Sequence, residues 1–238
     1  MTRFILFDAY GTLVELDDFY ARLQRGFAAA GVLLPAEIVT RAARAEMQHY
    51  IAHTVHAREE SDWLKLKNDC ARILAESIRA QNYPLDLSHE AFLEILNAAL
   101  VFRVFPDVRE ALETLRARGV AMGVLSNWDG SLRGVLRDLD LFQFFDFVLI
   151  SAEAGVQKPA REFFEVALQQ ARVEYSTLQT RDCFYVGDHY EGDIEGARNA
   201  GMTPVWLVRD ERDFASGEMR EDDEVLRIRE LGELAHLF

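Results

Sequence analysis

Four apolar runs in the chain lead into side chains that can do chemistry. The side chains that follow these runs are Asp8, Ser126 with Asn127, Lys158 and Asp188. Short apolar runs such as Phe4–Phe7 are typical of buried strands. In an open parallel sheet, ligands bind beyond the carboxyl ends of the strands. We therefore expect a candidate carboxylate nucleophile, a hydroxyl, an amide, an ammonium and a second carboxylate to meet at one edge of a sheet.

The elements that must position these groups fall into two classes. From Pro106 onward, strand-like and helix-like segments alternate, which predicts an α/β fold with a doubly wound, Rossmann-like parallel sheet. From about Leu16 to Phe102, apolar residues recur every three or four positions, which predicts several helices. We thus expect an α/β core domain made of residues 1–15 and 103–238, with a helical domain of residues 16–102 inserted into it.

Two local patterns add detail to the core domain. Asp107 and Glu110 have the spacing of a capping box, which predicts that a helix begins there. The stretch from about Arg209 to Glu224 is charged and turn-like, and we expect it to form solvated surface.

The polar segments resemble the motifs of a known superfamily. The quoted segments are Asp8-Ala9-Tyr10-Gly11-Thr12, Ser126-Asn127, Lys158-Pro159 and Gly187-Asp188 with Asp193. In their order and separation they are similar to the four motifs of the haloacid dehalogenase-like (HAD) hydrolases, and the similarity extends to about Met202. It implies a cap domain inserted after the first strand, the arrangement called subfamily I.

The resemblance implies that Asp8 is a nucleophile whose covalent intermediate is later cleaved by water. With a phosphate ester as substrate, Mg²⁺ would offset the negative charges, since it binds oxygens and one or two carboxylates. Asp8, Asp188 and the backbone carbonyl of Tyr10 would be its ligands. The remaining implied roles are substrate binding by Thr12, Ser126 and Asn127, charge neutralisation by Lys158, and support of the metal or of Lys158 by Asp193.

Five of these residues also fit a purely structural role. Ser126 and Asn127 suit a turn after a strand, and Lys158 suits an exposed loop, as most lysines do. Asp188 suits a glycine-rich surface loop, and Asp193 suits a helix N-cap.

Tyr10 departs from the pattern of the phosphatases in this superfamily. They usually carry a second Asp at that position, which protonates the leaving group and then activates water. Tyrosine, with a pKa near ~10, is a poor base at neutral pH. Asp-Ala-Tyr-Gly-Thr is instead the form found in 2-haloacid dehalogenases, where the departing halide needs no proton.

The other end of the site resembles the phosphatases. By the same resemblance, the dehalogenases use no metal and place Ser and Asn where this chain has Asp188 and Tyr190, and a Tyr where it has Phe164. We favour a Mg²⁺-dependent phosphatase acting on a small phosphate ester. The alternatives are a metal-free 2-haloacid dehalogenase that uses Asp8, and a catalytically weak binding module.

The composition of the chain limits the kinds of binding partner that we expect. The chain has 238 residues, 50% of them hydrophobic, and a formal net charge of −14, which argues against nucleic acid and anionic membrane surfaces. No apolar run approaches the roughly 18 residues of a membrane-spanning helix, and no signal peptide is visible. We therefore expect a cytoplasmic enzyme that acts on a small molecule. We expect Cys70 and Cys183 to be buried free thiols. The sequence leaves a monomer and a homodimer both open.

Overall fold

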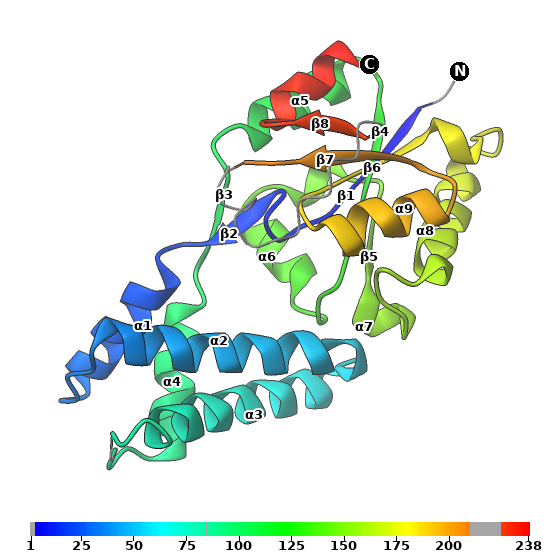
Figure 1. The fold of residues 1–238 in the computed structure, drawn as a ribbon. Coiled ribbons are helices and arrows are strands. Elements are labelled where there is room, and N and C mark those ends of the chain that lie inside the picture. The colour runs from blue at the N-terminus through cyan, green and yellow to red at the C-terminus, as the bar shows by residue number, and fades with distance from the viewer. Residues whose placement is uncertain (1–2, 84, 210–224) are drawn as a thin grey trace. The chain divides into compact units, whose positions relative to one another are not determined.

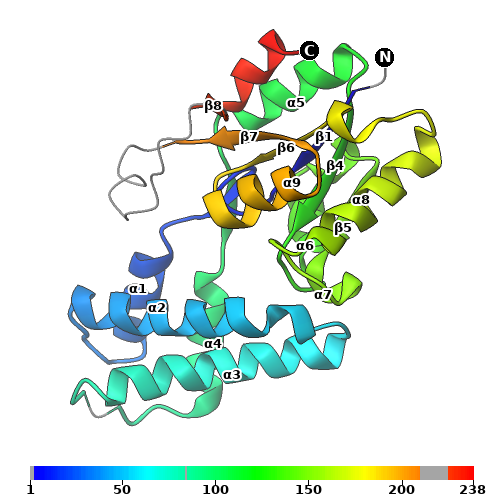
Figure 2. The same cartoon turned by 45° about the vertical axis from the view of Figure 1, so that its right-hand side comes forward.

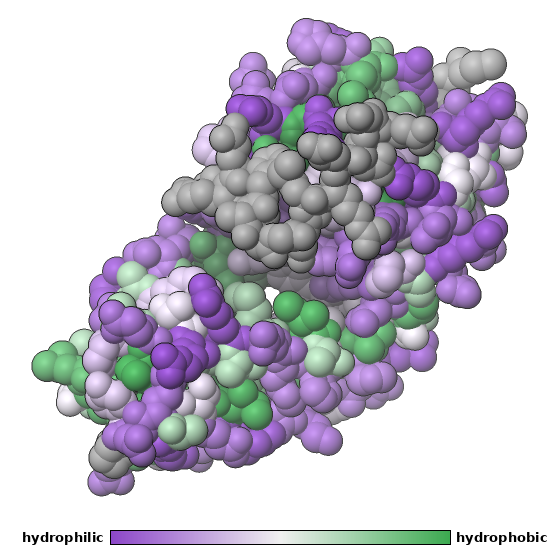
Figure 3. Space-filling view, viewed as in Figure 1, coloured by the Kyte–Doolittle hydropathy of each residue, from purple (hydrophilic) through white to green (hydrophobic). Residues whose placement is uncertain are grey.

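The computed structural model describes residues 3–83, 85–209 and 225–238. The chain forms two compact units, one made of Met1–Glu15 with Val104–Phe238 and the other of Leu16–Arg103. We call them the core unit and the helical unit. Hydrophilic residues predominate on the face shown in Figure 3.

The core unit is built on a six-stranded sheet in which every paired neighbour is parallel (Figure 1). The strand order is β5-β4-β1-β6-β7-β8. The strands are β1 (Phe4–Phe7), β4 (Ala121–Ser126), β5 (Phe147–Ile150), β6 (Cys183–Gly187), β7 (Thr203–Leu207) and β8 (Leu226–Ile228). The chain order runs outward in both directions from β1, so the topological switch point, where such sheets bind ligands, lies beside this strand.

Helices surround this sheet (Figure 2). They are α5 (Val108–Ala117), α6 (Leu132–Asp138), α7 (Ser151–Ala154), α8 (Arg161–Glu174) and α9 (Gly196–Asn199). All four residues of β1 are buried, and alternate residues of a strand face opposite sides of the sheet. Phe4 and Leu6 accordingly pack in one apolar cluster with Phe163 of α8 and Ala197 of α9. The predicted doubly wound parallel sheet is confirmed.

The helical unit contains α1 (Phe19–Ala29), α2 (Ala36–His53), α3 (Glu60–Arg79) and α4 (His89–Ala99), which share one apolar core. The chain enters this unit through β2 (Val14–Leu16) and leaves it through β3 (Phe102–Val104), and the two strands pair with each other. Cys70 in this unit and Cys183 in the core unit are buried thiols that form no disulfide, as expected.

A helix begins at Asp107 as predicted, but the predicted capping box does not form. Asp107 precedes α5, but its side chain makes no capping hydrogen bond. Its Oδ1 instead accepts from Arg209 at 2.8 Å, and its Oδ2 accepts from the backbone N–H of Leu231 at 2.7 Å. Both carboxylate oxygens thus bind groups far away in the sequence instead of the first N–H groups of the helix.

Arg209 is likewise not part of a solvated surface. Its guanidinium lies 4.0 Å from the centroid of the Phe105 ring and donates to the carbonyl of Thr12 at 2.8 Å. The rest of the predicted surface stretch, residues 210–224, lies outside the described residues. None of the helices that the structure describes is both long enough and apolar enough to cross a lipid bilayer.

Candidate active site

The ends of three neighbouring strands bring the first polar groups together. Asp8 directly follows β1, and its backbone N–H donates to the carbonyl of Val186 in β6 at 2.9 Å. Ser126 is the last residue of β4, and its Oγ donates to Asp8 Oδ1 at 2.9 Å. Asp188 directly follows β6. Because β1 pairs with both β4 and β6, the three side chains meet at one edge of the sheet.

The turn after Asp8 requires a glycine. Gly11 has a φ of 83°, which side chains rarely tolerate, and a Cβ there would lie 2.2 Å from Asp188 Oδ2. The turn therefore packs directly against the Asp188 carboxyl. In the next position, Thr12 Oγ1 donates to Asp188 Oδ1 at 3.3 Å.

Lys158 is buried, with 7% of its surface exposed, and is not the exposed loop lysine that its sequence position also allowed. Its Nζ lies 2.7 Å from Asp8 Oδ1, 2.6 Å from Asp193 Oδ1 and 2.8 Å from the hydroxyl of Tyr185. The side-chain amide of Asn127 makes two hydrogen bonds to the backbone of Lys158. Asn127 Nδ2 donates to the Lys158 carbonyl at 3.0 Å, and the Lys158 N–H donates to Asn127 Oδ1 at 2.8 Å.

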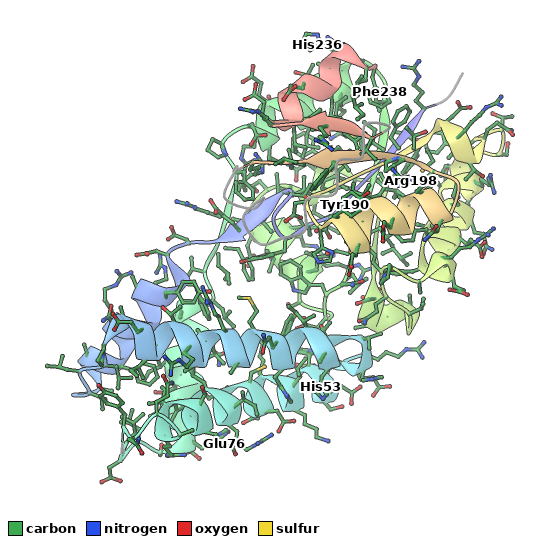
Figure 4. The ribbon with its side chains drawn as sticks, viewed as in Figure 1. His53, Glu76, Tyr190, Arg198, His236 and Phe238 are labelled. Atoms are coloured by element: carbon green, nitrogen blue, oxygen red, sulfur yellow. The ribbon has the colours of Figure 1, made fainter. Side chains whose placement is uncertain are left out.

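Asp193 lies on a π-helical turn, Tyr190–Glu195, that follows β6. Asp193 is fully buried, and its Oδ2 accepts from the His189 N–H at 3.0 Å. The side chain that caps the turn is that of His189, whose Nδ1 accepts from the Gly192 N–H at 2.9 Å. Tyr190, labelled in Figure 4, packs edge-on against Trp206 with ring centroids 5.0 Å apart. Single π-helical turns of this kind often occur at functional sites.

Asp8, Asp188 and Asp193 form an acidic cluster. One carboxylate oxygen from each residue lies within 4.8 Å of the others. Burial raises the pKa of the Asp8 carboxyl; the nearby Asp193 carboxylate raises it further, while Lys158 lowers it. The pKa of Asp188 is raised well above its usual value by the protein atoms crowded around its carboxyl group and by the carboxylates of Asp8 and Asp193.

A lysine of high pKa faces this cluster. Burial by itself lowers the pKa of Lys158, but the carboxylates of Asp193 and Asp8 outweigh that effect and hold the pKa above its ordinary value. Lys158 is therefore a permanent cation at neutral pH. If all three carboxyls of the acidic cluster are ionised, one ammonium leaves an excess of two negative charges.

The acidic cluster fits a divalent cation that prefers oxygen. Its donors are all carboxylate oxygens, and the Asp188 side chain is exposed. Mg²⁺ binds such oxygens and keeps several waters, whereas zinc sites draw mainly on nitrogen and sulfur. Tyr10 contributes no carboxylate; its side chain is 42% exposed, and its ring lies edge-on to Trp128 at 6.4 Å.

The sequence analysis did not identify two residues that contact the site. Tyr185 looked like one more apolar residue of β6, yet its hydroxyl reaches Lys158. Arg209 was assigned to the surface, yet it holds the carbonyl of Thr12. The available signal for Tyr185 was a hydroxyl within an otherwise apolar strand, because a buried hydroxyl requires a hydrogen-bond partner.

A family model described as haloacid dehalogenase-like hydrolase matches residues 2–201. The chain belongs to the haloacid dehalogenase-like hydrolases. The resemblance inferred from the four motifs is thereby confirmed.

Two curated proteins with different descriptions are similar in sequence to this HAD-like hydrolase. "Haloacid dehalogenase-like hydrolase domain-containing protein 3" of Homo sapiens is 36% identical over 123 residues, which cover 52% of this chain and 43% of that protein. The chain thus spans less than half the length of this curated relative. "Pyrimidine 5'-nucleotidase YjjG" of Escherichia coli is 29% identical over 224 residues, which cover 90% of this chain and 89% of that protein.

Solved structures show that the fold is shared. The putative HAD-hydrolase YfnB from Bacillus subtilis, bound to magnesium, superposes with a TM-score of 0.72 at 18% identity, over 99% of this chain and 98% of that one. Structures titled as 2-haloacid dehalogenases also share the fold at similarly low identity. Because a magnesium-bound HAD-hydrolase and 2-haloacid dehalogenases both have this fold, the fold alone does not identify the reaction.

Proposed function

We propose that this HAD-like hydrolase is a Mg²⁺-dependent phosphatase of small phosphate esters that uses Asp8 as its nucleophile. The observation that carries the proposal is the Asp188 carboxyl beside Asp8 and Asp193. Lys158 pairs with Asp8 and Asp193, and when all three carboxyls are ionised this one ammonium leaves an excess of negative charge. A phosphate ester adds further negative charge, and a divalent cation offsets it.

In the proposed reaction, a carboxylate oxygen of Asp8 bonds to phosphorus while the bond from phosphorus to the ester oxygen breaks. Water then cleaves the aspartyl-phosphate, which releases phosphate and restores the carboxylate. Ser126 and Lys158 both donate to Oδ1 of Asp8, and so they fix the rotation of the nucleophile. Holding a nucleophile in one orientation lowers the entropic part of the barrier.

The remaining residues take the following roles. Mg²⁺ held by Asp8, Asp188 and the carbonyl of Tyr10 would supply the positive charge that lets an anionic ester approach a carboxylate. Lys158 neutralises charge on the transferred group, while Thr12 and Ser126 lie close enough to Asp188 and Asp8 to contact substrate. Asn127 has both ends of its amide on the backbone of Lys158, which favours positioning of that lysine over the predicted direct contact with phosphate.

Tyr10 shapes the substrate range in this proposal. Without a carboxylic acid at position 10, the departing alkoxide receives no proton from that position. Esters whose leaving groups carry negative charge well should therefore react faster than simple alkyl esters.

A second candidate function is 2-haloacid dehalogenation, and the observation that favours it is the phenol side chain of Tyr10. A halide leaves as a stable anion and needs no proton. The carboxyl of Asp188 opposes this candidate, because it lies beside Asp8 and would repel the carboxylate of a haloacid. A binding module without catalysis is opposed by the buried Lys158, which is held directly on the Asp8 carboxylate.

A substrate panel tests these functions. Purified protein is given p-nitrophenyl phosphate, alkyl phosphates, pyrimidine nucleoside monophosphates and 2-chloropropionate, each with Mg²⁺ and with EDTA. We expect release of phosphate only with Mg²⁺, and no release of chloride. Chloride release that persists in EDTA, without phosphate release, would establish the dehalogenase, and no turnover of any substrate would favour the binding module.

A further inference from the structure

Tyr185 places a hydroxyl group inside the apolar core of the core unit. Tyr185 is fully buried in β6, and its ring packs edge-on against Phe164 of α8 with centroids 5.2 Å apart. Phenylalanine would fill the same space in this apolar cluster. The hydroxyl must therefore be explained by its polar contacts, since a buried hydroxyl needs partners.

Those contacts converge on Lys158. An ammonium group has three protons to donate. Lys158 Nζ has three acceptors within hydrogen-bond distance, namely Asp8 Oδ1 at 2.7 Å, Asp193 Oδ1 at 2.6 Å and the Tyr185 hydroxyl at 2.8 Å. The Tyr185 hydroxyl completes the hydrogen bonding of Nζ.

The hydroxyl also ties Lys158 to the strand that ends in Ser126. The Tyr185 oxygen lies 2.9 Å from the carbonyl of Leu125 and 3.1 Å from Asp193 Oδ1. Its single proton goes to one of these two acceptors. When it goes to Leu125, a chain of hydrogen bonds runs from the backbone of β4 through Tyr185 to the lysine beside Asp8.

We propose that Tyr185 is a positioning residue of this site: its hydroxyl holds the Lys158 ammonium on the Asp8 carboxylate. The carboxylates of Asp8 and Asp193 attract the ammonium from two sides, at 2.7 and 2.6 Å. The hydroxyl provides a third fixed contact, and it is uncharged, so it orients the ammonium without adding to the negative charge of the site.

The variant Tyr185→Phe removes one oxygen and keeps the ring against Phe164. The matched control is Tyr175→Phe, which removes the same oxygen from a partly buried tyrosine of the core unit, whose hydroxyl donates to Asp146 at 3.0 Å in an exposed hydrogen bond. Circular dichroism and thermal unfolding verify that both variants are folded.

The first readout needs no substrate. The chain has three lysines, Lys65, Lys67 and Lys158, so ¹⁵N-labelled protein has three side-chain ammonium groups to distinguish by NMR. Lys158→Arg assigns the third signal. We expect the Lys158 ammonium of the parent protein to exchange protons with water at least tenfold more slowly than that of exposed Lys65. In Tyr185→Phe we expect its exchange to quicken by roughly tenfold or more, and in Tyr175→Phe to stay unchanged.

The second readout is kinetic and rests on the proposed phosphatase function. With p-nitrophenyl phosphate and Mg²⁺, Tyr185→Phe should lower kcat by roughly ten- to hundredfold, because a small displacement of a catalytic group is enough for such a loss. KM should stay within about threefold, because the hydroxyl is buried behind Lys158 and does not contact substrate. Tyr175→Phe should match the parent.

The two readouts separate the two proposals. A parent protein without turnover would refute the phosphatase, and the exchange measurement would still decide the role of Tyr185. If Lys158 exchanges as fast as Lys65 in the parent, or if Tyr185→Phe leaves its exchange within twofold, the positioning role is refuted. A folded Tyr185→Phe variant of an active parent that retains parental kcat refutes it as well.

Discussion

Glu46 provides a test of the helical unit that can be worked out from its surroundings. It lies in α2 with 5% of its surface exposed, among the residues that form the core of this unit, and its carboxyl hydrogen-bonds to Cys70 of α3. Burial raises the pKa of Glu46 from 4.5 to about 7, and the Cys70 contact only partly offsets that rise. The folded protein therefore prefers this carboxyl in its neutral form.

The sign of the effect follows from proton linkage. Between pH 4.5 and about 7 the folded state holds the Glu46 proton more tightly than the unfolded chain does. The contribution of Glu46 to stability is thus fully present below pH 4.5, is lost as the pH rises through about 7, and changes little above that. The rise in pKa corresponds to a loss of about 3 kcal/mol in the free energy of unfolding, at 1.36 kcal/mol per unit.

The variant Glu46→Gln removes the charge at every pH. We expect it to exceed the parent in free energy of unfolding by up to about 3 kcal/mol near pH 8, and to match it within about 1 kcal/mol near pH 4.5. Urea unfolding followed by circular dichroism measures the difference at each pH. Glu94→Gln, on the exposed side of α4, is the control and should change stability by less than about 0.5 kcal/mol at both pH values. An advantage of Glu46→Gln that is equal at both pH values, or absent, would refute the reasoning.

Three further predictions concern the core unit. Asp8→Asn should abolish turnover and leave thermal unfolding close to that of the parent, because the amide has the same shape but cannot attack; residual activity within tenfold of the parent would remove Asp8 from the mechanism. Calorimetry should show millimolar or tighter Mg²⁺ binding to the parent and at least tenfold weaker binding to Asp188→Asn. Equal affinities would show that the cation binds away from the acidic cluster. Tyr10→Asp should raise kcat/KM for alkyl phosphates more than for p-nitrophenyl phosphate, because it supplies the missing acid; a parent that cleaves both ester classes equally fast would contradict this account of Tyr10.

The fold could be predicted because its signals are local and repeated. Runs such as Phe4–Phe7 are apolar throughout, as strands buried on both faces must be, whereas between Leu16 and Phe102 apolar residues recur mainly every three or four positions. The capping box at Asp107 failed for a different reason. The pattern of residues around Asp107 matched, but Arg209, far away in the sequence, binds the carboxylate. A local pattern carries no information about a partner that tertiary structure supplies.

The same distinction applies to the site. Asp8, Ser126 and Asp188 could be placed together because each follows a strand, and neighbouring parallel strands end at one edge. Tyr185 could not be placed with them, because its role depends on which face of β6 it occupies and on how far Lys158 extends toward it. Asn127 could be placed near Lys158, but its contact with the Lys158 backbone depends on the path of the loop between α7 and α8.

The central place of β1 also has a consequence for the order in which the protein takes shape during synthesis. Phe4 pairs with Ala121 on one side and with Cys183 on the other. While the chain is being made, this fully apolar strand has no partner until β4 has left the ribosome, and it lacks its second partner until β6 follows. The helical unit, Leu16–Arg103, is by then complete and can fold first. Contacts so distant in sequence form late, so Phe4–Phe7 stays unpaired for much of synthesis and is exposed to aggregation during that time.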